Sequence, residues 1–130
     1  MPTFFQFGCD RCQGADAGIA WESGRRRHVH SLIDESHYGI AITACDCGQH
    51  FVKVFTERID WVGGEDDQTW LLLPVLPAEV LQLQQCPVAE LRAVVTRIGE
   101  GRRFVMHWYP TGGALGTAWR DGGFWIGPHD

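Results

Sequence analysis

The sequence has no apolar run long enough to cross a membrane. Its longest such run, from Trp70 to Leu76, is far shorter than the roughly 20 residues that a spanning helix needs. The residues before Cys9 have neither the basic start nor the apolar core of a secretory signal peptide. We therefore expect a cytoplasmic protein without membrane contact. In that compartment thiols stay reduced, so closely spaced cysteines indicate metal or redox chemistry rather than disulfides.

The sequence also lacks the short motifs of several enzyme classes. It contains no Gly-x-x-x-x-Gly-Lys phosphate loop, no nucleophile elbow around a serine and no His-Glu-x-x-His. Glu57 and Asp60 fall on opposite faces of an expected strand, so they do not form a catalytic pair. An enzyme is thus less expected than a binding protein.

Positive charge is scarce as well. The net charge is −5, and the main basic cluster is Arg25-Arg26-Arg27. Affinity for nucleic acid comes mostly from lysine and arginine, so this charge argues against a nucleic-acid partner. We expect the three arginines to lie in a solvated loop or at a strand edge, and a nucleic-acid-binding role through them remains an alternative.

The length and composition fit a single folded domain over residues 1–130. A hydrophobic fraction of 45% and six tryptophans can fill a real core. The pattern predicts an α+β fold: an antiparallel β-sheet, one or two helices and a cysteine knuckle at one end. The knuckle belongs to a first half, residues 1–62. A second half, residues 63–130, holds a strand, the helices and tryptophan-rich C-terminal strands.

Individual elements follow from periodicity and from the turn residues. Residues 51–61 also fit helical spacing, but we favour a strand, because a cysteine knuckle at a hairpin tip needs a returning strand. Gly99 should lie just past the end of the second helix. We expect strands at residues 4–7, 38–44, 51–61, 69–75 and 103–109, short strands around Trp119 and at 124–126, a loop over 14–24, and helices that begin at Pro77 and Pro87.

Two close pairs of cysteines carry the strongest chemical signal. Cys9 and Cys12 are three positions apart, and Cys45 and Cys47 follow after 32 intervening residues. Two such pairs commonly hold one tetrahedral zinc ion, and four soft thiolates select Zn²⁺ or iron over magnesium or calcium. Gly48 suits the turn around the second pair, where a left-handed backbone is often required. These four cysteines are the expected ligands of a closed, structural Zn²⁺ site.

The spacing of these cysteines resembles the zinc-ribbon class, which combines a Cys-x-x-Cys knuckle with a second Cys-x-Cys-Gly or Cys-x-x-Cys-Gly knuckle. The resemblance covers about residues 9–60. The second pair is spaced by one residue, and Gln13 rather than glycine follows Cys12. These departures leave open a fourth ligand from His50, or from the pair His28 and His30. The resemblance implies a structural metal and no particular activity.

Two alternative interpretations of the cysteines and histidines, a redox motif and a catalytic metal site, are less favoured. A Cys9–Cys12 thiol–disulfide motif would normally open a helix, and the residues after Cys12 are poor helix formers. His28 and His30 would share one face of a strand and, with His50, could hold a catalytic metal. We expect instead that they are surface or edge-strand residues.

Three further potential ligands are given structural roles. We expect His37 to lie at the surface as well, and His107 to be a hydrogen-bonded residue at the core or its rim. Cys86 should be a small buried side chain.

The C-terminal region is rich in aromatic residues. They could line a ligand groove or a partner interface, but we favour a role in the core. Taken together, the sequence predicts a non-enzymatic, zinc-stapled protein that binds a partner protein. The aromatic residues in question are Trp108, Tyr109, Trp119, Phe124 and Trp125.

Overall fold

The fold is known from a computed structural model, which describes residues 7–59, 62–63, 66–110, 115–121 and 123–127. The strand expected at residues 4–7 lies almost wholly outside these ranges, and so does Asp60. Phe7, the one residue of that strand that is described, sits in a bend.

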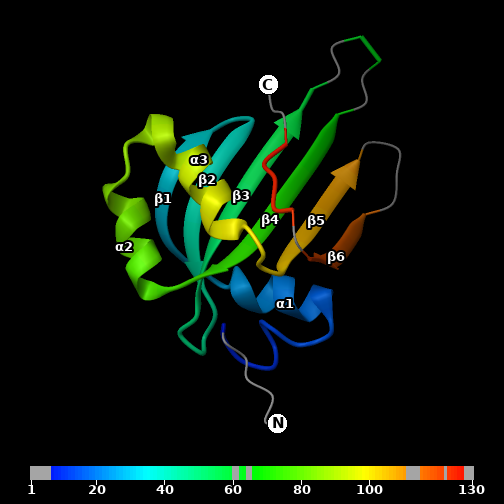
Figure 1. Cartoon of the computed structure of the whole chain (residues 1–130). Coiled ribbons are helices and arrows are strands. Elements are labelled where there is room, and N and C mark those ends of the chain that lie inside the picture. Colours follow the sequence, from blue (N-terminus) through cyan, green and yellow to red (C-terminus); the bar gives the residue numbers. More distant parts are fainter. Residues whose placement is uncertain (1–6, 60–61, 64–65, 111–114, 122, 128–130) are drawn as a thin grey trace.

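Six antiparallel strands form one sheet, and their order in the sheet is their order in the chain (Figure 1). Every strand therefore pairs with its sequence neighbour. The connection between β4 and β5 contains α2 and α3, whereas the other strands are joined by turns and loops without helices. The edge strands are β1 and β6. The predicted α+β class with an antiparallel sheet is confirmed. The strands are β1 (Arg27–Glu35), β2 (Tyr38–Ala44), β3 (His50–Arg58), β4 (Asp67–Val75), β5 (Phe104–Pro110) and β6 (Gly116–Arg120).

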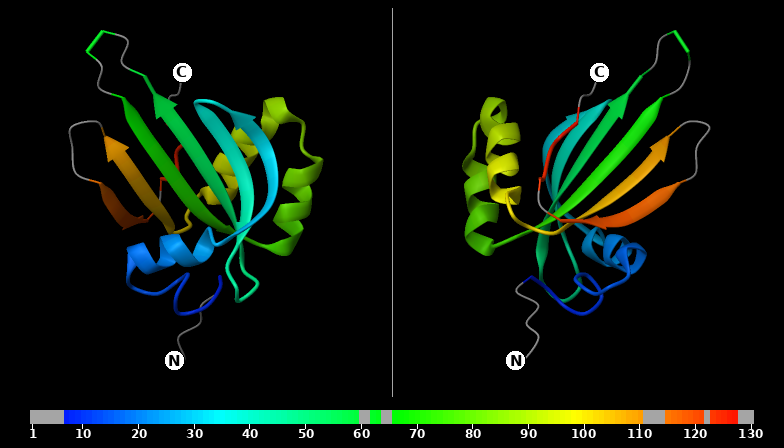
Figure 2. Two further views of the ribbon diagram at one scale, coloured as in Figure 1. Left: turned by 180° about the vertical axis from the view of Figure 1, so that it is seen from behind. Right: turned by 45° about the vertical axis from the view of Figure 1, so that its right-hand side comes forward.

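Helices cover both faces of this sheet, but unequally. α2 (Pro77–Gln85) and α3 (Val88–Gly99) lie together over one face, which we call the α2–α3 face. α1 (Ala17–Gly24) lies on the opposite face, near one end of the strands, which we call the α1 face (Figure 2). Within the described residues, no helix has the length and apolar sequence needed to cross a bilayer.

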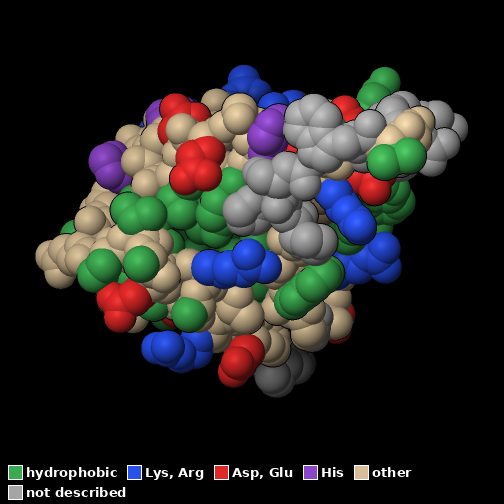
Figure 3. Space-filling view, turned by 90° about the horizontal axis from the view of Figure 1, so that it is seen from above, with side chains coloured by type: hydrophobic (Ala, Val, Ile, Leu, Met, Phe, Trp, Pro, Cys, Tyr) green, Lys and Arg blue, Asp and Glu red, His purple; other side chains and the backbone are tan. Residues whose placement is uncertain are grey.

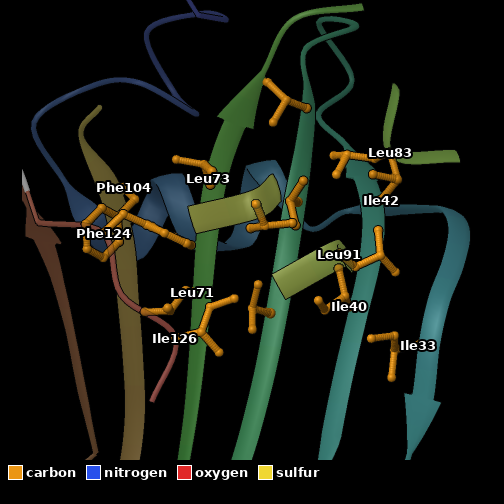
Figure 4. Close-up of a cluster of buried hydrophobic side chains, with 14 of the residues drawn as sticks. Ile33, Ile40, Ile42, Leu71, Leu73, Leu83, Leu91, Phe104, Phe124 and Ile126 are labelled. Atoms are coloured by element: carbon orange, nitrogen blue, oxygen red, sulfur yellow. The ribbon is translucent and has the colours of Figure 1, made fainter. Parts of the chain in front are cut away.

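The main core fills the space between the sheet and α2 and α3 (Figure 4). Alternate residues of the central strands point into it, for example Ile40 and Ile42 from β2 and Leu71 and Leu73 from β4. Leu91 of α3 packs against them. A second, smaller cluster on the α1 face is built around Trp21 and includes two of the cysteines.

Most of the predicted elements are present. The ambiguous segment 51–61 is a strand for most of its length, as favoured, because β3 pairs residue by residue with β2 from Tyr38↔Thr56 to Ala44↔His50. Pro77 is the first residue of α2. Gly99 is the last residue of α3, so it lies inside the helix rather than past its end.

The loop expected over residues 14–24 is wrong, because its second half is helix α1. Asp16 caps this helix: its carboxylate accepts a hydrogen bond from the Ile19 N–H at 3.0 Å. Ala20 and Trp21 are buried against the sheet. Burial of one face thus stabilises a helix of only eight residues in a segment with weak helix propensity. The fold has three helices among its described residues, one more than the upper limit expected.

The strand expected at residues 124–126 is also wrong. This segment crosses the α2–α3 face without pairing with the sheet, and Arg92 of α3 donates a hydrogen bond to the Ile126 carbonyl at 2.8 Å. Phe124 packs edge-on against Phe104, with ring centroids 4.9 Å apart. Alternate side chains are buried as in a strand, but the contacts are with core side chains. The short strand around Trp119 is confirmed as β6.

Candidate metal centre

Four cysteine sulfurs converge at one end of the sheet. Cys9 and Cys12 lie in the turns that precede α1, and Cys45 and Cys47 lie in the connection between β2 and β3. Both segments lie at the bottom of Figure 1. The sulfurs of Cys9 and Cys12 are 3.8 Å apart, those of Cys9 and Cys45 3.9 Å, and those of Cys12 and Cys47 3.8 Å. All four lie within 4.8 Å of one another.

These separations match the geometry of one tetrahedral metal centre. Four sulfurs at the usual zinc–thiolate distance of about 2.3 Å, placed at the corners of a tetrahedron, are about 3.8 Å apart. A disulfide would instead bring two sulfurs to about 2.05 Å, and all five cysteines are free thiols here. The four cysteines are therefore positioned to bind a metal ion.

The first knuckle depends on a glycine that precedes it. Gly8 has a positive φ of 87°, and a side chain at this position would overlap the sulfur of Cys12. The Cys9 N–H donates to the Cys12 sulfur at 3.3 Å, and the Gln13 N–H donates to the Cys9 carbonyl at 2.9 Å. The tight turn thus brings the two thiols of this pair onto one side of the chain.

The second knuckle is a hairpin turn. The Cys45 N–H donates to the Gln49 carbonyl and the Gly48 N–H donates to the Cys45 carbonyl, both at 2.9 Å. Gly48 has a φ of 98°, so the expected left-handed residue is confirmed. The guanidinium of Arg27 donates to the Cys45 carbonyl at 3.2 Å, which ties the turn to the start of β1.

Longer side chains fix both knuckles to the sheet. Arg103, just before β5, donates to the Gln13 carbonyl at 2.6 Å and stacks 3.6 Å from the ring centroid of Trp119. Gln49 donates through its amide to the Val75 carbonyl at 2.7 Å. The cysteines therefore sit on a scaffold that is held from β4, β5 and β6 as well as from their own loops.

The electrostatics of the four thiols also favour a cation. Burial opposes ionisation of Cys9, but the backbone N–H groups of Cys12 and Arg11 point toward its sulfur and lower the pKa of this thiol to about 6. At Cys12 and Cys45, burial and the neighbouring sulfurs raise the thiol pKa. Four adjacent thiolates repel one another, whereas a divalent cation among them would deprotonate all four.

The histidines that were alternative ligands lie elsewhere. His28 and His30 are exposed on edge strand β1, as expected for surface residues. A β-bulge between them pairs His28 with Thr43 and His30 with Ile42. The two residues therefore face opposite sides of the sheet, and the expectation of one shared face is wrong.

His50 is not part of the sulfur cluster either. It begins β3, opposite Ala44. In the described part of the chain, the four cysteines are the one group in which three or more potential metal ligands come together.

Three residues with structural expectations are placed as follows. His107 is confirmed at the rim of the core: its Nδ1 lies 2.6 Å from the Thr117 hydroxyl, its ring stacks on Trp21, and burial lowers its pKa. His37 is not simply at the surface but half-buried, with Nδ1 2.8 Å from a carboxylate oxygen of Glu57. Cys86 is half-buried rather than buried, at the end of α2.

The three arginines of the basic cluster are each paired with a nearby carboxylate. Arg25 lies 2.9 Å from Glu22, Arg26 lies 3.0 Å from Asp46, and Arg27 lies 3.9 Å from the same Asp46. Two of them thus neutralise the aspartate between the cysteines of the second knuckle. The position of this cluster, at the end of α1 and the start of β1, agrees with the expected strand edge.

The C-terminal aromatic residues divide between core and surface. Phe124 is buried, as favoured, but Trp125 is 66% exposed and Tyr109 is 53% exposed. For these two side chains the expected core role is wrong. They lie on different faces of the sheet, since Tyr109 belongs to the α1 face and Trp125 to a segment that crosses the α2–α3 face.

Comparison with models of protein families, with curated proteins and with solved structures finds no match to this chain. What can be stated is therefore a class defined by fold and site: an α+β protein with a six-stranded antiparallel meander and a four-cysteine cluster suited to a metal ion. The second knuckle lies at a hairpin tip, as in zinc ribbons, whereas the first leads into helix α1. Membership of the zinc-ribbon class stays a prediction.

Proposed function

We propose that Cys9, Cys12, Cys45 and Cys47 bind one structural Zn²⁺, and that the protein acts without catalysis as a cytoplasmic protein-interaction module. The observation that carries the metal assignment is the set of sulfur–sulfur distances of 3.8 to 3.9 Å. Zinc is the ion of choice because it accepts four thiolates in tetrahedral geometry and needs no redox partner.

A structural role follows from the closed ligand set. Four protein sulfurs fill a tetrahedral centre and leave no position for water or substrate. Cys12 and Cys45 are buried beneath the other two ligands. The metal would join two chain segments 36 residues apart, and so fix α1 and the first knuckle to the turn between β2 and β3. Binding energy of this kind stabilises the fold directly.

The metal assignment is tested by metal content and thiol reactivity on protein purified without added metal. We expect one zinc per chain and four thiols that do not react with a thiol reagent until a chelator is added, while Cys86 reacts at once. Protein without metal that contains a disulfide would contradict the assignment and favour thiol–disulfide chemistry. A second metal per chain would favour a catalytic site.

Support for a protein partner comes from large apolar side chains left exposed at α2 and at the start of α3. Leu76 is 40% exposed, and Leu81 and Val88 are each 60% exposed. Residues of this kind are favoured at interfaces when they lie close together. We place the docking surface on the α2–α3 pair, at Leu81 and Val88 and at the N-terminus of α2.

The interaction is tested by photocrosslinking in cells, with the Leu81→Glu variant compared with Leu115→Glu. Leu115 is a suitable control because it is 56% exposed and lies outside the helices. We expect discrete crosslinked products that Leu81→Glu removes and Leu115→Glu retains. Crosslinks that both variants lose, or both keep, would contradict this surface.

A further inference from the structure

A cavity of about 380 Å³ opens on the α2–α3 face, beyond the part that the helices cover. It lies between residues of β3 to β6 and the C-terminal segment that crosses the sheet, drawn in red in Figure 1. Its volume is within the range of about 300 to 1,000 Å³ that is usual for small-molecule sites. The lining consists of Thr56, Arg58, Asp67, Thr69, Leu71, Phe104, Met106, Arg120, Asp121, Gly123, Trp125 and Gly127.

The chemistry of this face changes in one direction along the paired strands β3 and β4. Side chains of alternate residues share a face, so successive cross-strand pairs show the order in which groups meet a ligand. The floor near the core is apolar, a pair of hydroxyl groups follows, and charged groups stand at the mouth. The pairs are Val54↔Leu71, Thr56↔Thr69 and Arg58↔Asp67.

Aromatic and thioether side chains form the apolar part. Phe104 and Met106 of β5 line the cavity from the sheet. Trp125 lines it from the C-terminal segment although its side chain is 66% exposed. Its neighbours Phe124 and Ile126 are buried in the core, so the indole is held at the cavity by fixed backbone. An exposed tryptophan beside an apolar cavity is a common element of small-molecule sites.

The charged side chains that line the cavity are balanced and lie at two places: the end of β3 with the start of β4, and the end of β6. Arg58, Asp67, Arg120 and Asp121 line the cavity, two of each sign. Within the described residues, none of these side chains takes part in an ion pair or a hydrogen bond, although the guanidinium of Arg120 lies 5.9 Å from the ring centroid of Trp108. Figure 3, which looks onto the end of the molecule opposite the cysteines, shows basic, acidic and hydrophobic side chains interspersed.

We propose that this cavity binds a small, uncharged amphipathic molecule, with its apolar or aromatic body between Trp125 and Met106 and its polar group at Thr56 and Thr69. Hydroxyls both donate and accept hydrogen bonds, which suits an alcohol or an amide. The balanced charges give no net attraction for an anion or a cation. This site is independent of the cysteine cluster and of the docking surface at Leu81.

Three naphthalene probes of equal size test the ligand class: 2-naphthalenemethanol, 2-naphthoate and 2-naphthylmethylamine, measured by titration with detection by NMR. We expect the alcohol to bind with a millimolar or lower dissociation constant and at least as tightly as both charged probes. Failure of all three to shift resonances of the cavity residues would overturn the proposal. So would a preference of tenfold or more for one charged probe.

Two pairs of variants test the position of the site. Trp125→Ala should weaken binding of the alcohol about tenfold, while Tyr109→Ala, which removes a comparably exposed ring from the other face, should leave it unchanged. Melting temperatures of both variants should stay close to that of the parent, because both rings are exposed. Equal effects of the two variants on binding would overturn the site.

The second pair concerns the charges at the mouth. Arg58→Gln should shift the preference among the probes toward the amine, and Asp67→Asn should shift it toward the carboxylate, each about threefold. Binding of the alcohol should change little in both variants. Shifts of the same sign in the two variants would show that these side chains do not face the ligand, and would overturn the proposal.

Discussion

The cysteine end of the sheet and the lining of the cavity differ in whether their polar side chains form hydrogen bonds within the chain. At the cysteine end, Arg27, Arg102 and Arg103 all donate hydrogen bonds to backbone carbonyls, and the sulfurs face one another. Around the cavity, Arg58 and Arg120 form no such bonds within the described chain.

The difference separates stability from recognition. Polar groups that are hydrogen-bonded within the chain stabilise the fold, because removing one of them leaves its buried partner without a hydrogen bond, which costs free energy. Groups that are left unsatisfied around a cavity are available to a ligand. We therefore expect substitutions at the cysteine end to change the free energy of unfolding, and substitutions around the cavity to change mainly binding.

The largest effect is expected for Cys45→Ser. Loss of one ligand should remove most of the free energy of metal binding, which is about 10 kcal/mol or more for structural zinc sites and comparable to the whole stability of a domain. The N-terminal half should lose its structure, seen as a loss of zinc and a collapse of the thermal transition. Cys86→Ser is the control and should melt like the parent. A Cys45→Ser protein with full solubility and an unchanged melting temperature would disprove a role of the metal in stabilising the fold.

Removal of the metal by a chelator should act locally before it acts globally. We expect amide exchange to become at least about tenfold faster in α1 and in the turn between β2 and β3, because the metal joins these segments. Exchange in β5 and in α3, which lie outside the N-terminal half, should change much less. Hydrogen–deuterium exchange with mass spectrometry measures both regions in one experiment, and a uniform increase over the whole chain would contradict the local role.

A smaller effect is expected for Glu79→Gln. The carboxylate of Glu79 lies 2.7 Å from both terminal nitrogens of Arg102, and it also accepts the Leu76 N–H at 2.8 Å. Loss of this pair should destabilise the protein by about 2 kcal/mol at neutral pH in chemical denaturation. The exposed pair of Glu22 and Arg25 is the control, and Glu22→Gln should cost less than about 0.5 kcal/mol.

The pH dependence of the same variant has a defined sign. Burial opposes ionisation of Glu79, but Arg102 and the Leu76 N–H lower its pKa below the ordinary 4.5. A carboxyl with a lowered folded-state pKa contributes its stability above 4.5 and loses it as the pH falls through the folded-state value. The difference between parent and Glu79→Gln should therefore be constant near neutral pH and shrink in acid. A difference that grows in acid would contradict this assignment.

The smallest effect, and one of opposite sign, is expected for Thr69→Val. Its hydroxyl lines the cavity and takes part in no hydrogen bond within the described chain. Valine has a higher strand propensity and adds apolar surface beside Leu71, so we expect a gain of about 0.5 kcal/mol in the free energy of unfolding. Binding of 2-naphthalenemethanol should weaken at the same time. A loss of stability with unchanged binding would place Thr69 with the structural residues.

Much of the sheet was predictable because its signals are local. The alternation of residues 38–44 and the turn at Gly48 predict a hairpin without any knowledge of the rest of the chain. The pairs of cysteines were equally visible as neighbours in sequence. Pro77 predicted the start of α2 correctly, because proline is favoured in the first turn of a helix.

The parts that were not predictable depend on contacts distant in sequence. α1 forms because Trp21 packs beside Leu72 and Val105. In the sequence, only the capping residue Asp16 indicated where this helix begins. The path of residues 124–126 is set by a hydrogen bond from Arg92, 34 positions away. Gly8 and Arg103 were missed as parts of the metal centre, although a glycine directly before a knuckle could have been recognised.

The bulges of edge strand β1 have a consequence for how the chain behaves in a crowded solution. Register shifts occur at two places, between His28 and His30 and between Ser31 and Ile33. An edge strand with regular spacing is a template on which another chain can add a strand, and this is a common start of aggregation. The bulges break that spacing, and exposed charged side chains such as Arg27 and Asp34 add to the obstruction. These features therefore disfavour the addition of a strand from a second copy at β1.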